Sequence, residues 1–169
     1  MLNKAPVGRW PAELERREAI KPVIEPDMIA IFRFFNEVGI IHQLSQSKFE
    51  SVMPEGMSMA QFSVLNHFVR LGRIESPARL AKAFQVTKGA MTNTLGRLEK
   101  QDYVSIKPDP DDGRAKLVEI TQKGKVAHQD CIIALAPILG KLNSDLGVGD
   151  FAKALPQLEI IRNYLDNNR

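Results

Sequence analysis

The sequence contains a single cysteine, Cys131, and three histidines that lie far apart in the chain, His42, His67 and His128. One cysteine can form neither an intramolecular disulfide nor a thiolate zinc cluster. Cys131 is followed by a run of apolar residues. Because such a setting raises the pKa of a thiol, we expect a buried and unreactive side chain. A metal site needs clustered ligands, so the sequence predicts neither a metal nor a cofactor.

The sequence patterns of common enzyme classes are also missing. The chain has no HExxH motif of a zinc protease, no GxxxxGKS or GxxxxGKT phosphate loop, no GxGxxG dinucleotide motif and no GxSxG nucleophile elbow. No acid and base residues are arranged in a way that suggests catalysis. We therefore predict that the protein is not an enzyme.

Long hydrophobic runs are absent. A membrane span needs about 18 consecutive apolar residues, and the longest candidate, residues 28–44, is interrupted by Arg33, Glu37 and other polar side chains. Residues 1–11 are polar and lack the apolar core of a signal peptide. The sequence therefore predicts a cytoplasmic protein without a membrane partner.

The composition is typical of a globular protein. The 169 residues are 44% hydrophobic and 25% charged, which suits one core with terminal arms. The net charge is only +3, but residues 70–125 hold 12 Lys and Arg against 7 Asp and Glu, whereas the rest of the chain holds 11 against 13. A local basic excess is typical of a protein that binds a polyanion, although a solvated charged face would have the same composition.

The N-terminal part of the chain has two regions. Residues 1–26 carry four prolines and no sustained period, which predicts an arm that either packs on a neighbouring subunit or stays mobile. Residues 28–47 are predicted to form a helix with apolar residues over most of its circumference. A helix of this kind is usually buried on several sides, and a second subunit is one way to bury it.

Clear start signals divide the middle of the chain into short helices. Ser58 and Gln61 have the spacing of a capping box, and Gly72 ends the helix that follows. Ser76 and Pro77 open a short helix as its N-cap and its first helical residue.

Only Gln85 and Val86 separate this short helix from the next start signal, at Thr87. The helix that follows is expected over residues 88–101. Two helices joined by so short a turn are typical of a helix-turn-helix.

A β-hairpin is predicted next. Residues 103–106 and 117–120 alternate apolar and polar side chains on either side of a Pro, Asp and Gly cluster at 108–113. Arg114 and Lys116 follow directly after the tip of this long loop.

Two helices are predicted at the C-terminal end. Thr121 is the expected N-cap of a helix over residues 122–143, and Asp150 that of a helix over residues 150–165, with Pro156 favouring a later start. Together with the first helix they carry more apolar surface than a small monomer can bury, which predicts an interaction between subunits.

The second helix of the helix-turn-helix has the side chains needed to read DNA. A recognition helix must present small or hydrogen-bonding residues at its N-terminal outward turn, where they face base edges in the major groove. Lysine and arginine beside them can reach phosphates. An ordinary solvated helix face is the alternative. The predicted DNA-binding residues of this helix are Thr87, Lys88, Gly89, Ala90, Thr92, Asn93 and Arg97.

The segment from Ser76 to Lys125 resembles the winged helix-turn-helix of MarR-type bacterial transcription regulators. The resemblance depends on Leu80-Ala81 followed by a helix ending in LEK at residues 98–100, and on DDGR at residues 111–114 followed by LVEITQKG at residues 117–124. It implies a mainly α fold with a small β wing, in which a winged helix-turn-helix lobe is joined to N- and C-terminal dimerisation helices.

The resemblance also implies a domain organisation and a function. Residues 1–26 would be an arm, 27–55 a dimerisation helix, 56–125 the DNA-binding domain and 126–169 the C-terminal dimerisation helices. The implied protein is a homodimer on double-stranded DNA, with a pseudo-palindromic operator whose half-sites lie about one helical turn apart. It would be a repressor released by a small organic effector, often an aromatic acid.

Roles for the wing follow from the same resemblance. Arg114 would enter the minor groove, where concentrated negative potential attracts arginine, and Asp112 would orient it. A surface ion pair between these two side chains, without a partner, is the alternative. Lys107 and Lys116 would contact phosphates or merely flank the strands.

Three residues are candidates for an effector pocket: Phe35, His42 and His67. A lone histidine on a mostly apolar helix is more often a core residue with its hydrogen bonds satisfied, and this remains the alternative for both histidines.

Four positions depart from the pattern of the resembling regulators. Gln85 and Asp102 stand where glycine is usual, and Thr94 stands where the family is usually apolar. Gly96 lies inside the recognition helix, where glycine costs about 1 kcal/mol relative to alanine. Gln85 and Thr94 leave open an alternative function, that of a helical dimerisation or adapter protein with the same fold and no DNA binding.

Overall fold

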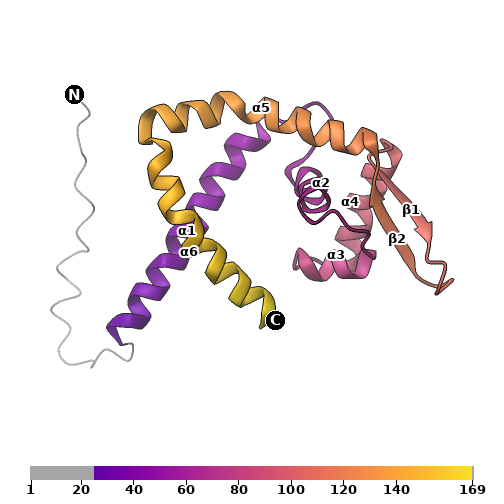
Figure 1. Cartoon of the computed structure of the whole chain (residues 1–169), viewed down its shortest axis with the longest axis horizontal. Coiled ribbons are helices and arrows are strands. Elements are labelled where there is room, and N and C mark those ends of the chain that lie inside the picture. Colours follow the sequence, from indigo (N-terminus) through magenta and orange to yellow (C-terminus); the bar gives the residue numbers. More distant parts are fainter. Residues whose placement is uncertain (1–24, 169) are drawn as a thin grey trace. The chain divides into compact units, whose positions relative to one another are not determined.

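The computed structural model describes residues 25–168 (Figure 1). Six helices and two strands lie in this part of the chain, which confirms the predicted mainly α fold with a small β wing. The predicted arm, residues 1–26, lies almost wholly outside the described residues. In chain order the elements are α1 (Pro26–Glu50), α2 (Met59–Leu71), α3 (Pro77–Ala83), α4 (Lys88–Lys100), β1 (Val104–Pro108), β2 (Lys116–Ile120), α5 (Gln122–Leu146) and α6 (Val148–Asn167).

The chain divides into two compact units, residues 1–43 and 44–169. The described part of the first unit belongs to α1, which is longer than the predicted helix. Its first helical residue is Pro26, whose fixed φ suits that position. At the other end Lys48 lies in the last turn of the helix, where a cation is favoured by the helix dipole.

None of the side chains of α1 is buried. Its large apolar residues are exposed instead, so this helix carries an extended apolar surface. The exposed apolar residues of α1 are Met28, Ile29, Ile31, Phe32, Phe35, Val38, Ile40, Ile41 and Leu44.

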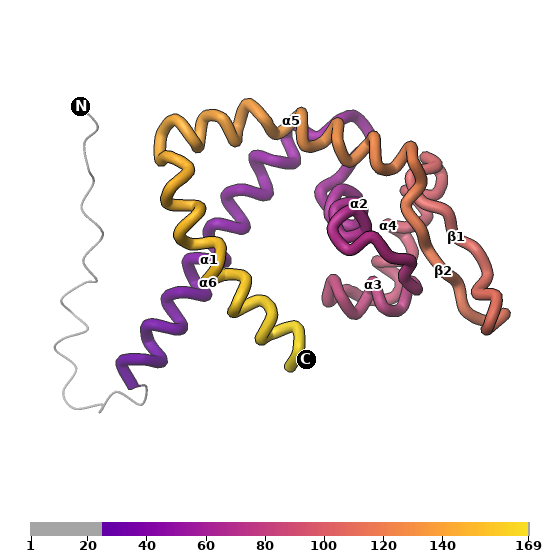
Figure 2. The backbone as a smooth tube through the Cα atoms, in the orientation of Figure 1, coloured from indigo at the N-terminus to yellow at the C-terminus, as the bar shows by residue number. Residues whose placement is uncertain are grey.

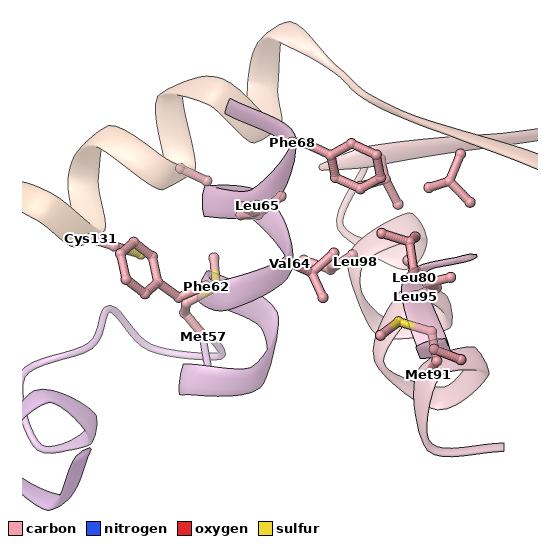
Figure 3. Packing of buried hydrophobic residues seen from close by; sticks show 14 of the residues in the cluster. Met57, Phe62, Val64, Leu65, Phe68, Leu80, Met91, Leu95, Leu98 and Cys131 are labelled. Carbon is pink, nitrogen blue, oxygen red and sulfur yellow. The ribbon is translucent and has the colours of Figure 1, made fainter. Parts of the chain in front are cut away.

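The core of the second unit lies among α2, α3, α4, β2 and α5. Leu65, Leu80 and Leu98 are fully buried, and Figure 3 shows side chains from α2, α3 and α4 gathered in this cluster. Cys131 of α5 is also fully buried, as expected. Its burial, with a smaller contribution from Asp130, raises the pKa of the thiol, which suppresses thiolate chemistry.

The start signals in the sequence work as expected in α2. Ser58 Oγ accepts a hydrogen bond from the Gln61 N–H at 3.3 Å, and Gln61 Oε1 accepts one from the Ser58 N–H at 3.0 Å. This is the predicted capping box. Gly72 ends the helix with a left-handed φ of 61°. The boundaries of α2 are therefore set by local side-chain and backbone chemistry.

The turn between α3 and α4 is closed without glycine. Gln85 adopts a left-handed φ of 54°, and its side-chain amide donates to the Lys82 carbonyl at 3.1 Å. The Val86 N–H then donates to the Ala81 carbonyl at 3.1 Å. Thr87 caps α4 by accepting from the Ala90 N–H at 3.1 Å. The predicted helix-turn-helix therefore forms, although its turn contains an unfavourable backbone conformation.

The wing is an antiparallel pair of strands, β1 and β2 (Figure 2). Their register aligns Val104 with Ile120 and Pro108 with Lys116. The strands reach further toward the loop than predicted, because Lys107 and Pro108 are paired as well. A backbone bridge joins β2 to Glu75, in the linker between α2 and α3. This third short segment of the wing was not predicted.

The two C-terminal helices follow one another almost without a break. Thr121 caps α5 as predicted, accepting from the Gly124 N–H at 3.0 Å. The predicted start of α6 was wrong: Gly147, with φ 82°, allows a new helix to begin at Val148, so Asp150 lies inside the first turn. Pro156 is inside α6 and does not delay its start.

Among the described residues, no single helix is long and apolar enough to cross a membrane. The pair α5 and α6 meets a test of length and composition only when taken together, across a bend of 104°.

Candidate nucleic-acid interface

The outward face of α4 presents the predicted recognition residues to solvent. Met91, Leu95 and Leu98 are buried on the inner face, so the helix is held by its core side while the other side remains open. The Thr92 hydroxyl donates to the Lys88 carbonyl at 2.8 Å, which leaves its oxygen as an acceptor and its methyl group exposed. The predicted residues exposed here are Thr87, Lys88, Gly89, Ala90, Thr92, Asn93 and Arg97.

Backbone hydrogen bonds shape the tip of the wing. Asp112 Oδ1 accepts from the Arg114 N–H at 3.0 Å, and the Asp112 carbonyl accepts from the Ala115 N–H at 2.8 Å. The described wing has no ion pair between the side chains of Asp112 and Arg114. Asp112 therefore acts on Arg114 through the backbone, and the Arg114 side chain is exposed.

A concavity of about 500 Å³ lies between the start of α3, the outward face of α4 and the wing. Its walls are Ser76–Ala78 on one side and Arg114–Lys116 on the other, with Lys88 and Thr92 of α4 between them. Leu95 contributes an apolar part of the lining.

The concavity, which we call the basic groove, brings four of the predicted site residues together: Lys88, Thr92, Arg114 and Lys116. Glu99 is the only acidic residue that lines it. A concave surface with cations on its walls suits the phosphate backbone of a nucleic acid.

The other predicted DNA-binding residues lie outside the lining of this groove. Lys107 is exposed on β1, opposite Leu117 in the strand register. Gly89 has open space where a Cβ would stand, so a binding partner could approach the helix backbone closely at that position.

Sequence reasoning missed the contribution of the α2–α3 linker to the groove. Ser76 and Pro77 were recognised as a helix start, but nothing local indicates that they face the wing. Glu75 was not singled out at all, although it is buried. The only sequence signal was a charged residue between Ile74 and a helix cap, which is too common to be informative.

The predicted effector residues are spread over both units. Phe35 and His42 lie on α1, in the first unit, and His67 lies on α2, in the second. The Phe35 ring is in edge-to-face contact with Phe34, with centroids 5.4 Å apart. A shared pocket for these three residues remains a prediction, and none of them lines the basic groove.

His67 has a partly enclosed setting. Its side chain is 12% exposed, and its ring lies near those of Phe68 and Phe84. Burial lowers its pKa, because the loss of hydration outweighs the attraction of Glu75, whose Oε1 is 3.6 Å from Nε2. This is the setting expected for a neutral histidine packed at the edge of a core.

His128 of α5 joins that helix to α2. Its Nε2 lies 3.1 Å from Asn66 Oδ1, and its ring stacks on Phe62 with centroids 5.4 Å apart. Burial lowers the pKa of His128. A second concavity, of about 320 Å³, is lined by His128 together with Phe68, Ile74 and Lys125.

The residues described in the structure contain no group of three His, Cys, Asp or Glu side chains that could hold a metal ion. The groove offers cations, a hydroxyl group and a helix face, which are suited to binding a polyanion.

Comparisons with known proteins agree on one family. A model of the MarR family matches residues 55–115. The multiple antibiotic resistance protein MarR of Escherichia coli is 33% identical over 105 residues, which are 57% of this chain and 72% of that protein. The transcriptional activatory protein BadR of Rhodopseudomonas palustris is 26% identical over 132 residues, 75% of this chain and 73% of that protein.

A solved structure gives the same result. A crystal structure of a mutant of E. coli MarR complexed with operator DNA superposes with a TM-score of 0.62 at 25% identity, covering 78% of this chain and 95% of that one.

Proposed function

The chain belongs to the MarR family of winged helix transcription regulators, and we propose that it binds a pseudo-palindromic operator in double-stranded DNA as a homodimer. As a member of this family it is a regulator and not an enzyme. Its lobe for DNA binding would be residues 56–125. A cytoplasmic location, where the genome of a bacterial cell lies, is part of the same proposal.

The observation that carries this proposal is the basic groove. Lys88 and Thr92 come from α4, whereas Arg114 and Lys116 come from the wing, further along the chain. A helix in the major groove and a neighbouring loop in the minor groove must lie on one side of the duplex. The convergence of both on one concavity is the arrangement that such a complex needs.

Roles for the predicted contacts follow from their chemistry. Thr92 and Asn93 would face base edges, and the absence of large side chains at Gly89 and Ala90 would let α4 enter the major groove. Arg114 would enter the minor groove. Phosphate contacts would come from Lys88, Arg97, Lys107 and Lys116.

Dimerisation is supported by the apolar surface of the terminal helices. Besides α1, both α5 and α6 expose large apolar side chains, and apolar patches of this extent mark interaction sites. We propose that residues 27–55 and 126–169 form the interface with a second copy. The exposed apolar residues of α5 and α6 include Ile133, Leu139, Leu146, Phe151, Leu155, Leu158 and Leu165.

We further propose that the homodimer is a repressor released by a small organic effector. An effector that binds one spacing of the two recognition helices more tightly would shift the population toward that spacing and lower operator affinity. One relative is named as an activatory protein, so the position of the operator relative to its promoter is the observation that distinguishes repression from activation.

The test is capture of DNA fragments from the source genome by the purified full-length protein, followed by binding of the captured site at several salt concentrations. We expect enrichment of one pseudo-palindromic site whose affinity falls steeply as salt rises. Weak binding to every duplex alike would instead favour the adapter alternative. Mass spectrometry of the same sample detects an effector that was purified with the protein and keeps it off DNA.

A further inference from the structure

Glu75 is a buried carboxylate at the edge of the candidate nucleic-acid interface. Its side chain is 3% exposed, and it lies in the linker between α2 and α3, one residue before the N-cap Ser76. A carboxylate is almost never fully buried unless it is paired, because removal from water costs more than most single contacts return.

Both oxygens of Glu75 face nitrogen groups from the surrounding elements. Arg73 Nε donates to Oε1 at 2.6 Å, and Arg79 Nε of α3 lies 3.4 Å from Oε2. His67 Nε2 of α2 is 3.6 Å from Oε1. The side chain of Glu75 therefore pairs with Arg73 of the linker and with Arg79 of α3, and it lies beside His67 of α2.

The backbone of Glu75 connects the same linker to the wing. The Glu75 N–H donates to the Val118 carbonyl at 3.1 Å, and the Val118 N–H donates to the Glu75 carbonyl at 2.8 Å. Val118 is fully buried in the centre of β2. This pair of hydrogen bonds is the bridge that fixes the linker against the wing.

The side-chain contacts and the backbone bridge of Glu75 both lie next to the walls of the basic groove. One wall, Ser76–Ala78, begins at the residue after Glu75. The other wall, Arg114–Lys116, ends two residues before Val118 on the same strand. A shift of Glu75 would therefore change the distance between the start of α3 and the wing.

We propose that Glu75 is a positioning residue that sets the spacing between α3 and the wing, so that α4 and Arg114 can engage the two grooves of one DNA site together. This inference rests on the proposed DNA binding. Stability alone does not account for the carboxylate, because Arg73 and Arg79 are 56% and 70% exposed, and ion pairs with such exposed partners contribute little to stability. What the carboxylate adds is a fixed position for Arg73 and Arg79.

Charge removal separates positioning from simple electrostatics. Loss of a negative charge from a DNA-binding lobe strengthens the attraction to phosphates. If Glu75 acted only through its charge, Glu75→Gln would tighten operator binding. If Glu75 acts by positioning, Glu75→Gln should weaken operator binding instead. Glu119→Gln is the matched control, because Glu119 is exposed on β2, next to Val118, and makes the same change of charge.

The experiment measures operator affinity of the full-length protein at one salt concentration. We expect Glu75→Gln and Glu75→Leu each to weaken binding about tenfold, whereas Glu119→Gln leaves it unchanged or tighter. Thermal melting shows that the variants are folded. If Glu75→Leu does not fold, Glu75→Gln, which has nearly the same shape, still gives the result. Unchanged or tighter binding by a folded Glu75 variant would overturn the proposal.

A double-mutant cycle shows whether the effect passes through the wing. In the Arg114→Ala background the wing loses its proposed minor-groove contact, so Glu75→Gln should change affinity by less than about twofold. The same tenfold loss in both backgrounds would mean a general disturbance of the fold and would contradict the inference. A wild-type protein that binds no operator would instead remove the proposed function, and this inference with it.

Discussion

Gln85 and Asp102 enclose the recognition helix α4 between two left-handed residues. Their φ values are 54° and 58°, and among residues 25–168 they are the only residues other than glycine with positive φ. Both stand at positions where the resembling regulators usually have glycine. A left-handed conformation costs an L-residue about 1–2 kcal/mol, so both ends of α4 adopt a backbone conformation that other contacts must offset.

Glycine at the first of these positions should stabilise the protein. We expect Gln85→Gly to raise the free energy of unfolding by up to about 1 kcal/mol, because the strain that it relieves exceeds the entropy that glycine gains in the unfolded chain. The corresponding rise in Tm is about 2–4 °C. Asp102→Gly should gain less, because aspartate tolerates this conformation better and Asp102 Oδ2 also contacts Lys123 Nζ at 3.5 Å. Thermal melting measures both changes. A lower Tm for Gln85→Gly would contradict the claim that the backbone at Gln85 is strained.

A second prediction concerns the contact between α5 and the wing. A Cβ at Gly124 would collide with the Tyr103 carbonyl oxygen, so Gly124→Ala must displace either the helix or the strand. We expect a loss of about 1–3 kcal/mol in the free energy of unfolding, measured by denaturant titration. Gly96→Ala is the control. A Cβ there meets nothing within 4 Å, so this change should stabilise by up to about 1 kcal/mol.

Stability should fall on mild acidification. Burial lowers the pKa of His128, and of His67 as well, below the usual 6.5. In the window between the folded and unfolded pKa values the unfolded chain binds more protons, so stability rises with pH there. The stability that the neutral histidines contribute is fully present above about pH 6.5, and it declines as the pH falls below that value. Melting temperatures across this range should show the decline. In His128→Gln the fall of Tm with decreasing pH should be shallower. An equally steep fall would contradict the role of His128 in this pH dependence.

The proposed subunit interface predicts a change of oligomeric state. Leu155 of α6 is exposed in the single chain, and in a dimer it would be covered. Leu155→Asp would then bury a charge without a partner, and we expect self-association to weaken by at least about a hundredfold. Analytical ultracentrifugation measures this directly. Asn163→Asp adds the same charge at an exposed polar position of α6 and should leave the dimer intact. A monomeric wild-type protein would refute the interface.

Local signals in the sequence were sufficient to predict most of the helices. Ser58, Ser76, Thr87 and Thr121 each accept a hydrogen bond from the backbone of the helix that they begin, so a cap residue and the apolar period after it locate the element. The wing strands were predicted in the same way, from alternation around a turn.

The errors lie where distant parts of the chain decide the structure. The bridge between Glu75 and Val118 joins residues far apart in sequence, and no local pattern encodes it. The same holds for the walls of the basic groove, which were predicted as separate contacts and not as one concavity. The start of α6 is a different, local error, because the positive φ of Gly147, and not a cap at Asp150, sets it.

The central claim is that α4 and the wing form one DNA-binding surface. The most direct measurement is operator affinity against salt concentration for the wild type, Arg114→Ala and Lys153→Ala, a charge-matched control on α6 whose side chain is exposed. We predict that Arg114→Ala weakens binding about 10- to 100-fold and makes the salt dependence shallower, because one cation fewer faces the DNA, while Lys153→Ala matches the wild type. Equal affinity and equal slope for all three proteins would contradict the claim.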